Sequence, residues 1–133
     1  MLPFATSAIR SATNSEDVLA KLRKETGVNL QILSGEEEAR LTFLAVRRWY
    51  GWSAGRICDL DIGGGSLEMS IGTNENPDVA CSVNLGAARL TREWFETDPP
   101  DKKVIADLRD YIDSTLEDPV AQLLDSGPLD LAV

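Results

Sequence analysis

The 133-residue chain carries a net charge of −9, and 43% of its residues are hydrophobic. This length and apolar content are enough for a folded domain with a core, and they argue against disorder throughout. No apolar run approaches the roughly 18–20 residues needed to cross a bilayer, and the acidic charge argues against general binding to nucleic acid or anionic membranes. The chain has no histidine, which excludes Ser-His-Asp and Cys-His catalysis within it.

The first part of the chain predicts a short strand, a helix and a second strand. Residues 3–10 have the pattern of a strand that ends in a loop. A capping-box sequence at residues 13–16 begins a helix, which Gly27 ends. The alternating residues 28–33 predict a short strand. We expect the apolar side chains of the helix to face inward.

A second helix is expected after Ser34. This serine is its predicted N-cap, with Glu37 as the capping-box partner. Apolar residues lie nearly all round this helix, which predicts that it is well buried. Glycines interrupt the chain after it. We therefore place a boundary near Gly55, with residues 1–54 and residues 55–133 as separate units.

Residues 56–71 predict two strands joined by a glycine turn. The first segment is mostly apolar, as expected for a strand buried on both faces, and the second alternates like a strand with one buried face. Gly63, Gly64 and Gly65 carry no Cβ, so the turn has access to positive φ and to close contact with a ligand. Its successive N–H groups, together with the hydroxyl of Ser66, predict an anion-binding turn.

Two acids flank this turn, Asp61 before it and Glu68 after it. Amides for phosphate and carboxylates for a hard cation are what phosphoryl chemistry requires, because Mg²⁺ takes oxygen ligands and is usually bound together with phosphates. A carboxylate in an apolar strand is costly to bury without a metal or a hydrogen-bond partner, which strengthens the case for Asp61. A glycine-rich hairpin without a ligand is the alternative interpretation.

The remaining residues predict a third strand, which completes a β-meander, followed by helices. The strand covers residues 79–85, and helices cover 86–95 and 103–116, with a further helix that opens at Pro119. Residues 129–133 have the pattern of a strand that is just beginning. We therefore expect the chain to be a fragment of a longer protein.

The chain contains two cysteines, Cys58 and Cys81. Both lie in apolar, strand-like segments, so we expect two reduced core thiols and a cytoplasmic protein. Two cysteines without histidine are too few soft ligands for a zinc site.

Four segments carry a resemblance to a known family. ATSAIRSATN, ILSGEEEARL, LDIGGGSLE and NLGAARLT occur in this order, and with them the chain resembles the exopolyphosphatase/guanosine pentaphosphate phosphohydrolase (Ppx/GppA) family over nearly its whole length. The resemblance implies an α/β fold of ribonuclease-H-like lobes, as in the actin-like ATPase superfamily, with the active site between two lobes. Residues 1–54 would be the C-terminal part of the first lobe, and residues 55–133 the N-terminal part of the second. The implied reaction is hydrolysis of the terminal phosphate of inorganic polyphosphate, or of pppGpp to ppGpp, with Mg²⁺.

The resemblance also implies roles for individual residues. Glu38, the third acid of its run, matches the general base for the attacking water. Asp61 and Glu68 match the acids that position the metal and its waters, and Arg10 matches an arginine of the other lobe that reaches phosphate. The phosphate-binding turn is matched by Gly63, Gly64, Gly65 and Ser66.

Some of these residues have simpler explanations. Acids in the first turn of a helix stabilise the helix dipole without further function, which applies above all to Glu36 and Glu37. An arginine in a surface loop, such as Arg10, is usually just solvated. Arg89, in the last of the four segments, could contact phosphate or make a structural contact.

Other functions also stay open at this point. A superfamily ATPase or kinase would share the glycine turn but pass phosphate to another acceptor, and a non-catalytic module would bind polyphosphate or (p)ppGpp without turnover. A homodimer is an open alternative for the assembly. The family's phosphate turn that precedes the region of Met1, and the one expected after Val133, are absent from this sequence. We therefore expect the chain alone to be inactive.

Overall fold

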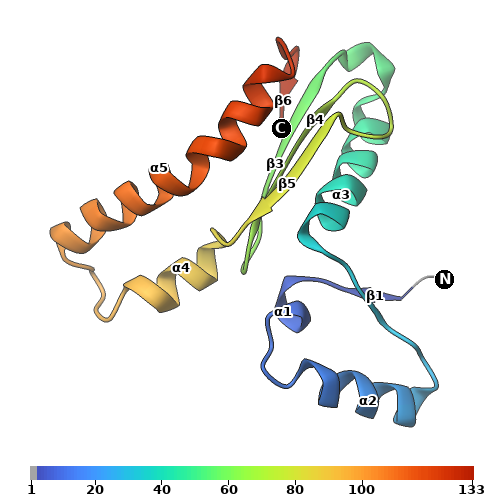
Figure 1. Cartoon of the computed structure of the whole chain (residues 1–133), viewed down its shortest axis with the longest axis vertical. Helices are drawn as coiled ribbons and strands as arrows, with labels where there is room; N and C mark the ends of the chain where they lie inside the picture. The colour runs from blue at the N-terminus through green and yellow to red at the C-terminus, as the bar shows by residue number, and fades with distance from the viewer. Residues whose placement is uncertain (1–2) are drawn as a thin grey trace.

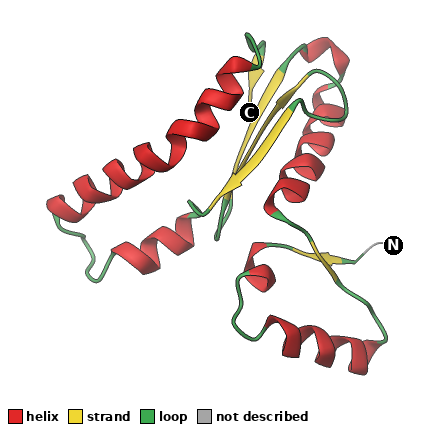
Figure 2. Cartoon of the chain, in the orientation of Figure 1, coloured by secondary structure: helices red, strands yellow, loops and turns green. Residues whose placement is uncertain are grey.

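The computed structural model of the chain describes residues 3–133, which form two separate sheets and the helices around them. A parallel pair of two-residue strands lies near the N-terminus, and a four-stranded sheet follows (Figure 1, Figure 2). The elements in chain order are β1 (Phe4–Ala5), α1 (Ser7–Arg10), α2 (Ser15–Thr26), β2 (Gln31–Ile32), α3 (Gly35–Tyr50), the 3₁₀ turn η1 (Trp52–Ala54), β3 (Ile57–Ile62), β4 (Leu67–Gly72), β5 (Val79–Val83), α4 (Ala87–Trp94), α5 (Lys102–Asp125) and β6 (Leu131–Ala132).

The four-stranded sheet has the strand order β5-β4-β3-β6. β3, β4 and β5 are antiparallel neighbours, and β6 adds to the other side of β3 in the parallel direction. The predicted β-meander is therefore confirmed. Its third strand ends at Val83 and not at residue 85, because the amide of Leu85 turns back to donate to the Val83 carbonyl at 2.8 Å.

Two helices cover the two faces of this sheet, α5 on one side and α3 on the other (Figure 1). The α5 side holds an apolar core, formed by Cys58, Leu67, Met69, Ile71, Leu85 and Leu123. On the α3 side, the ring of Phe43 lies against Gly72 and is fully buried. Because side chains alternate along a strand, the polar residues between the apolar ones in β4 lie under α3.

The burial of the first two meander strands differs from the prediction. β4 is buried on both faces, with Glu68 and Ser70 at 3% and 0% exposure, because α3 covers the side that we expected to face solvent. β3 shows the opposite difference, since Leu60 and Ile62 are exposed. β6 pairs with β3 as far as Cys58, and the Leu60 amide still reaches the Val133 carbonyl, so only the last residues of β3 lie at the edge of the sheet.

α3 buries one stripe of its surface only. Ala39, Phe43 and Arg47 follow one another at intervals of four residues and face the sheet. Trp49 is 85% exposed, so the prediction of a well-buried helix is wrong. Because α3 packs on one sheet only, the sheet covers only the side of the helix that faces it.

Arg47 is a buried cation that has no carboxylate partner within residues 3–133. Its Nη1 donates to the Gly51 carbonyl at 3.2 Å, and its Nη2 donates to the carbonyls of Gly55 and Gly72 at 2.7 and 2.9 Å. The guanidinium also lies 5.8 Å from the centroids of two aromatic rings. Arg47 thus joins the end of α3, the turn after it and the end of β4.

α5 runs without a break through Pro119, where we expected a new helix to open. Proline has no N–H, so the carbonyl of Thr115 one turn earlier loses its helical partner, and such a residue typically costs about 3 kcal/mol in a helix interior. The helix continues because its apolar stripe crosses the proline and packs on one core. The residues of that stripe are Ile112, Leu116 and Leu123.

The N-terminal elements are short and largely exposed. α2 follows Asn14 and has no side-chain cap, so the capping box predicted at residues 13–16 does not form. Gly27 ends this helix with a φ of 73°, as predicted. No α2 side chain is fully buried: Leu19 and Leu22 are half-buried and Val18 is exposed, so the inward-facing prediction is correct only in part. β1 and β2 pair over only two residues each, too small a surface to cover the helix.

The division of the chain near Gly55 stays a prediction, and residues 1 and 2 of its first unit lie outside the described residues. α3, which we assigned to the first unit, packs against the sheet of the second. Across residues 3–133, no helix combines the length and the apolar character needed to span a membrane.

Candidate functional site

The three adjacent acids at the start of α3 lie in different surroundings. Glu37 closes the predicted capping box, because its Oε2 accepts from the Ser34 amide at 2.7 Å and its own amide donates to Ser34 Oγ at 3.1 Å. These bonds lower the pKa of Glu37, the bond from the backbone most of all. Glu36 pairs with Arg40 one turn later, with 2.8 Å between Oε1 and Nη2. Both acids therefore have local partners.

Glu38 contacts a distant segment instead. Its Oε2 lies 3.2 Å from Nη1 of Arg10, and the two side chains are 18% and 27% exposed. Nη1 of Arg10 also donates to the Leu33 carbonyl, at 2.6 Å. The fold thus brings together the residue predicted as the base and the arginine predicted to bind phosphate.

The carbonyl groups of the glycine turn all face the start of α4. Those of Gly63 and Gly64 accept backbone amides of the first turn of α4, each at 2.9 Å. The carbonyl of Gly65 accepts from Nε of Arg89 at 2.8 Å. A trans peptide directs its N–H group opposite to its carbonyl. The amides that follow these carbonyls, up to that of Ser66, therefore point away from α4.

These amides have the properties of an anion-binding turn. Within residues 3–133, the amides of Gly64, Gly65 and Ser66 donate to no protein acceptor. None of the three glycines adopts a positive φ, so our reason for their presence needs correction. Close approach is visible at Gly65, where a Cβ would lie 3.0 Å from Ser7 Oγ, and at Gly86, where a Cβ would overlap the backbone of Gly65 and Ser66.

Polar side chains line the sheet face under α3. Asp61 and Glu68 are direct cross-strand neighbours, so their side chains share this face. Glu68 is buried, and its Oε1 accepts from Ser82 Oγ at 2.7 Å. Asp59 shares the face two residues before Asp61, and its burial, with the negative charge of Asp61 as a smaller effect, raises its pKa to about 6.

The acids predicted as metal ligands suit a magnesium ion that is shared with a substrate. Mg²⁺ is usually held by one or two carboxylates, while phosphates and waters complete its coordination. Asp61 and Glu68 offer two carboxylates on one face. Within residues 3–133, no group of three or more acids or cysteines could hold a metal, so an ion held by this pair would take its other ligands from phosphate and water.

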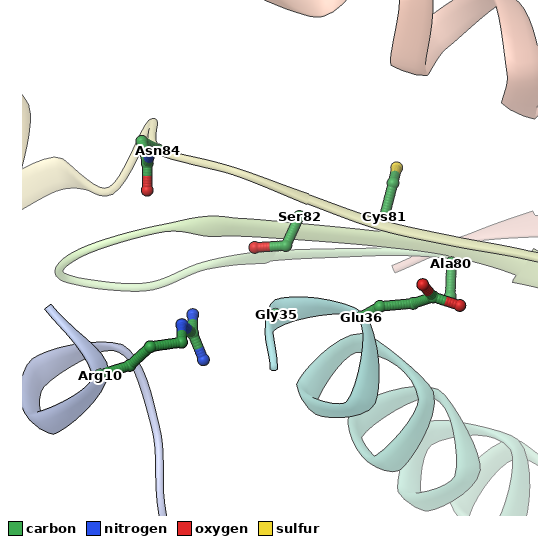
Figure 3. A pocket seen from close by; sticks show the side chains of 7 residues that line it. All are labelled: Arg10, Gly35, Glu36, Ala80, Cys81, Ser82 and Asn84. Carbon is green, nitrogen blue, oxygen red and sulfur yellow. The ribbon is translucent and has the colours of Figure 1, made fainter. Parts of the chain in front are cut away.

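A cleft of about 430 Å³ lies between Arg10, the first turn of α3 and β5. Its lining comes from α1, the first turn of α3 and β5 with the residue that follows it, and consists of Arg10, Gly35, Glu36, Ala80, Cys81, Ser82 and Asn84. Figure 3 shows Arg10 reaching toward the start of α3, with Ser82 on the strand opposite. Gly35 is in tight contact there, because a Cβ on it would overlap Ser82. Contacts therefore run from Arg10 through Gly35 and Ser82 to Glu68.

The glycine turn meets the same N-terminal segment. A Cβ on Gly65 would lie 3.0 Å from Ser7 Oγ, and Nη2 of Arg89 donates to Ser11 Oγ at 3.1 Å. Arg10 lies between these two serines in the sequence. The glycine turn and the Arg10–Glu38 pair are thus both in contact with α1 and the residue after it.

Four further residues of this site were not predicted from the sequence. Ser82 and Asp59 carried a detectable signal, because strand alternation places Ser82 opposite Glu68 and places Asp59 on the face of Asp61. Gly35 and Gly86 had no local signal, since the contacts that require a glycine come from segments far away in the chain.

Solved structures of known proteins share this fold. An exopolyphosphatase from Cytophaga hutchinsonii matches with a TM-score of 0.83 and 26% identity, over 95% of this chain and 40% of that one. The Aquifex aeolicus member of the Ppx/GppA family matches with a TM-score of 0.65 and 32% identity, over 85% of this chain and 37% of that one. The expected α/β fold of the actin-like ATPase superfamily is therefore confirmed.

Curated sequences give a stronger likeness. Exopolyphosphatase 1 of Mycobacterium tuberculosis and that of Mycobacterium leprae are each 62% identical to this chain over 133 residues. The match covers 100% of this chain but only 39% of each relative. A family model described as the Ppx/GppA phosphatase family matches residues 2–133. The chain therefore belongs to the Ppx/GppA phosphatase family.

Proposed function

We propose that these residues form part of an exopolyphosphatase, which hydrolyses the terminal phosphoanhydride bond of inorganic polyphosphate. The observation that carries the proposal is the position of Glu38, the one of three adjacent acids that pairs with Arg10. The likeness to Exopolyphosphatase 1 supports polyphosphate as the substrate. Because the chain spans 39% of that relative, the proposal concerns the longest natural chain that carries these residues, called the full-length protein below.

Glu38 acts as the general base in this proposal. Its carboxylate takes a proton from a water molecule while the water oxygen attacks the terminal phosphorus. The bond from that phosphorus to the bridging oxygen breaks, and the shortened polyphosphate leaves with the electron pair. Arg10 holds the carboxylate in place and turns a guanidinium toward the phosphate. Glu36 and Glu37 are less suited to this role because each is held by a local partner.

The glycine turn and the sheet acids stabilise charge on the substrate. The amides of Gly64, Gly65 and Ser66 bind oxygens of the transferred phosphate. Asp61 and Glu68 would hold Mg²⁺, which, when bound, neutralises negative charge on the phosphates. Ser82 keeps Glu68 oriented through its hydroxyl.

Hydrolysis of pppGpp is the second candidate, because the matching family is named for both activities. The bond that breaks is again a terminal phosphoanhydride, so the groups described above would serve either substrate. The names of the mycobacterial relatives favour polyphosphate. A cytoplasmic location and a homodimer stay predictions.

Replacement of the base tests the proposal in the full-length protein. Glu38→Gln keeps the size of the side chain and removes the base, so we expect kcat on polyphosphate to fall by about 10²–10⁴-fold. Binding of polyphosphate, measured by calorimetry, should survive. Asp61→Asn should instead raise the Mg²⁺ concentration needed for half-maximal activity and lower kcat as well.

Glu37→Gln is the matched control for this experiment. It preserves a capping-box side chain, so it should cost well under about 1 kcal/mol of stability and leave kcat nearly unchanged. Circular dichroism checks that each variant is folded. Loss of turnover in Glu37→Gln but not in Glu38→Gln would show that Glu37, and not Glu38, is the base. Full activity in these two variants and in Asp61→Asn would refute the mechanism.

A further inference from the structure

Arg89 binds the glycine turn through both its backbone and its side chain. Its amide donates to the Gly64 carbonyl at 2.9 Å, and its Nε donates to the Gly65 carbonyl at 2.8 Å. Nη2 donates to Ser11 Oγ at 3.1 Å, and Nη1 lies 3.5 Å from Oε1 of Glu93. With 20% of its side chain exposed, this arginine connects α4, the turn and the residue next to Arg10.

The Gly65–Ser66 peptide is the part of the turn that depends on this side chain. The two preceding carbonyls are held by backbone amides of α4, which no substitution removes except proline. The Gly65 carbonyl is held by Nε of Arg89. Because the Ser66 N–H lies opposite that carbonyl across the same peptide plane, its direction is set by the arginine.

We propose that Arg89 is a positioning residue that aims the Ser66 amide at the substrate phosphate and ties the phosphate-binding turn to the segment that carries Arg10. This inference rests on the function proposed above. It assigns no direct phosphate contact to Arg89, whose three nitrogens contact Gly65, Ser11 and Glu93. A planar guanidinium can hold a carbonyl and a hydroxyl at once in a fixed geometry, which a lysine ammonium does not reproduce.

The neighbouring Arg92 provides a matched control. It belongs to the same helix and borders the same cavity of about 480 Å³ beside Gly64 and Gly65. Its side chain is 73% exposed, and its ion pair is a 3.7 Å contact with Glu93. Loss of Arg92 removes the same charge from the same cavity but no bond to the turn.

The test compares Arg89→Gln, Arg89→Lys and Arg92→Gln in the full-length protein, with kcat and KM for polyphosphate measured well below the melting temperature of each variant. A misdirected amide weakens a charge-assisted bond to phosphate, so we expect both Arg89 variants to lose about 10–100-fold in kcat/KM. Part of this loss should appear in kcat, because charge on the transferred phosphate is redistributed in the transition state. Arg92→Gln should stay within about twofold of the wild-type value, as expected for an exposed charge.

Full activity of Arg89→Lys would show that charge alone matters and would overturn the proposal. An unchanged kcat/KM in Arg89→Gln would also overturn it, and so would an equal loss of kcat/KM in Arg92→Gln. If both Arg89 variants fail to fold, Ser11→Ala removes the other anchor of the guanidinium. It should lower kcat/KM by about 2–5-fold, the range expected for a single hydrogen bond, and an unchanged value overturns the link to Arg10.

Binding of inorganic tripolyphosphate, measured by calorimetry, separates this inference from the proposed function. A wild-type protein that binds tripolyphosphate but does not hydrolyse polyphosphate contradicts the proposed function only. The role of Arg89 is then supported if Arg89→Gln weakens this binding about 10-fold or more, and refuted if it does not. A wild-type protein that neither binds nor hydrolyses these phosphates contradicts both.

Discussion

Glu36, Glu37 and Glu38 show how the position of a residue in a helix decides what its side chain can do. Successive residues of an α-helix point about 100° apart, so three adjacent acids cannot share a partner. Glu37 returns to the N-cap, Glu36 follows the surface to Arg40, and Glu38 faces Arg10. The capping pattern in the sequence identifies Glu37 and thereby separates it from Glu38. The pairing with Arg10 depends on the tertiary fold and could not be read from any local pattern.

Gly35 supports the acidic face through its missing side chain. Because a Cβ there would overlap Ser82, we expect Gly35→Ala to push Ser82 away from Glu68 and to cost about 1–3 kcal/mol of unfolding free energy, as overpacked sites do. Denaturant unfolding measures this change. Gly64→Ala is the stability control, since its Cβ would meet its nearest neighbour, Ala88, at an ordinary 3.8 Å. The explanation fails if both variants lose the same stability, or if the double variant Gly35→Ala with Ser82→Gly regains none of it.

The two thiols should react slowly in the folded protein. Burial raises the pKa of Cys58, with the charge of Asp59 as a smaller effect, and burial also raises the pKa of Cys81. A raised pKa leaves less thiolate, the reactive form, at any given pH. At pH 8 we expect alkylation of both thiols to be at least about tenfold slower than in the denatured chain. Labelling should become faster only when the pH exceeds the usual pKa range of cysteine. Rapid labelling of both thiols without denaturant would contradict this.

Among the elements, β4 and α5 were predicted least well, for the same reason. The alternation of β4 is typical of a half-buried strand, yet α3 covers its polar face and leaves Glu68 buried beside Ser82. Pro119 is a local signal to end a helix, yet packing of residues on both sides of it keeps α5 continuous. In both cases a distant element outweighs the local pattern. The position of the glycine turn, the meander and the cap of α3 were predicted correctly because their causes lie within a few residues of one another.

α5 should therefore become more stable without its proline. Pro119→Ala restores an N–H group for the Thr115 carbonyl, so we expect the unfolding free energy to rise by about 1–2 kcal/mol, after allowance for the greater freedom of the unfolded chain. Denaturant unfolding of the same chain measures this gain. Asp118→Ala, next to it and exposed, controls for helix propensity and should change stability by about 0.6 kcal/mol or less. A stability loss in Pro119→Ala would mean that the proline itself supports the packing.

On the scale of the whole molecule, the candidate site depends on contacts between the N-terminal segment and the four-stranded sheet. Arg10 reaches Glu38, Ser7 lies against Gly65, and Ser11 accepts from Arg89. The four sequence motifs located each of these regions separately. Their meeting around α1 could not be derived from spacing, because it depends on how β1, β2 and α3 place that short helix.

The 133-residue chain by itself should release no phosphate from polyphosphate above the blank. It covers 39% of the exopolyphosphatases it resembles, and phosphoryl transfer requires phosphate ligands on every side of the transferred group. A phosphate-release assay with Mg²⁺ measures this, with the full-length protein at equal molar concentration as the positive control. Metal-dependent release by the short chain at a rate near that of the full-length protein would show that the site is misplaced.

The attachment of β6 also has a consequence for the order in which the sheet assembles. The amide of Arg56 donates to a carboxylate oxygen of Asp130 at 2.7 Å, across 74 positions of the chain, and the Leu60 amide reaches the Val133 carbonyl at 3.0 Å. Ordering so long a loop costs entropy before these bonds form, whereas the hairpins of the meander close over a few residues. The meander should therefore fold early and β6 should join late. In native-state hydrogen exchange, the Val133 amide should lose its protection at a lower free energy than the amides of β4.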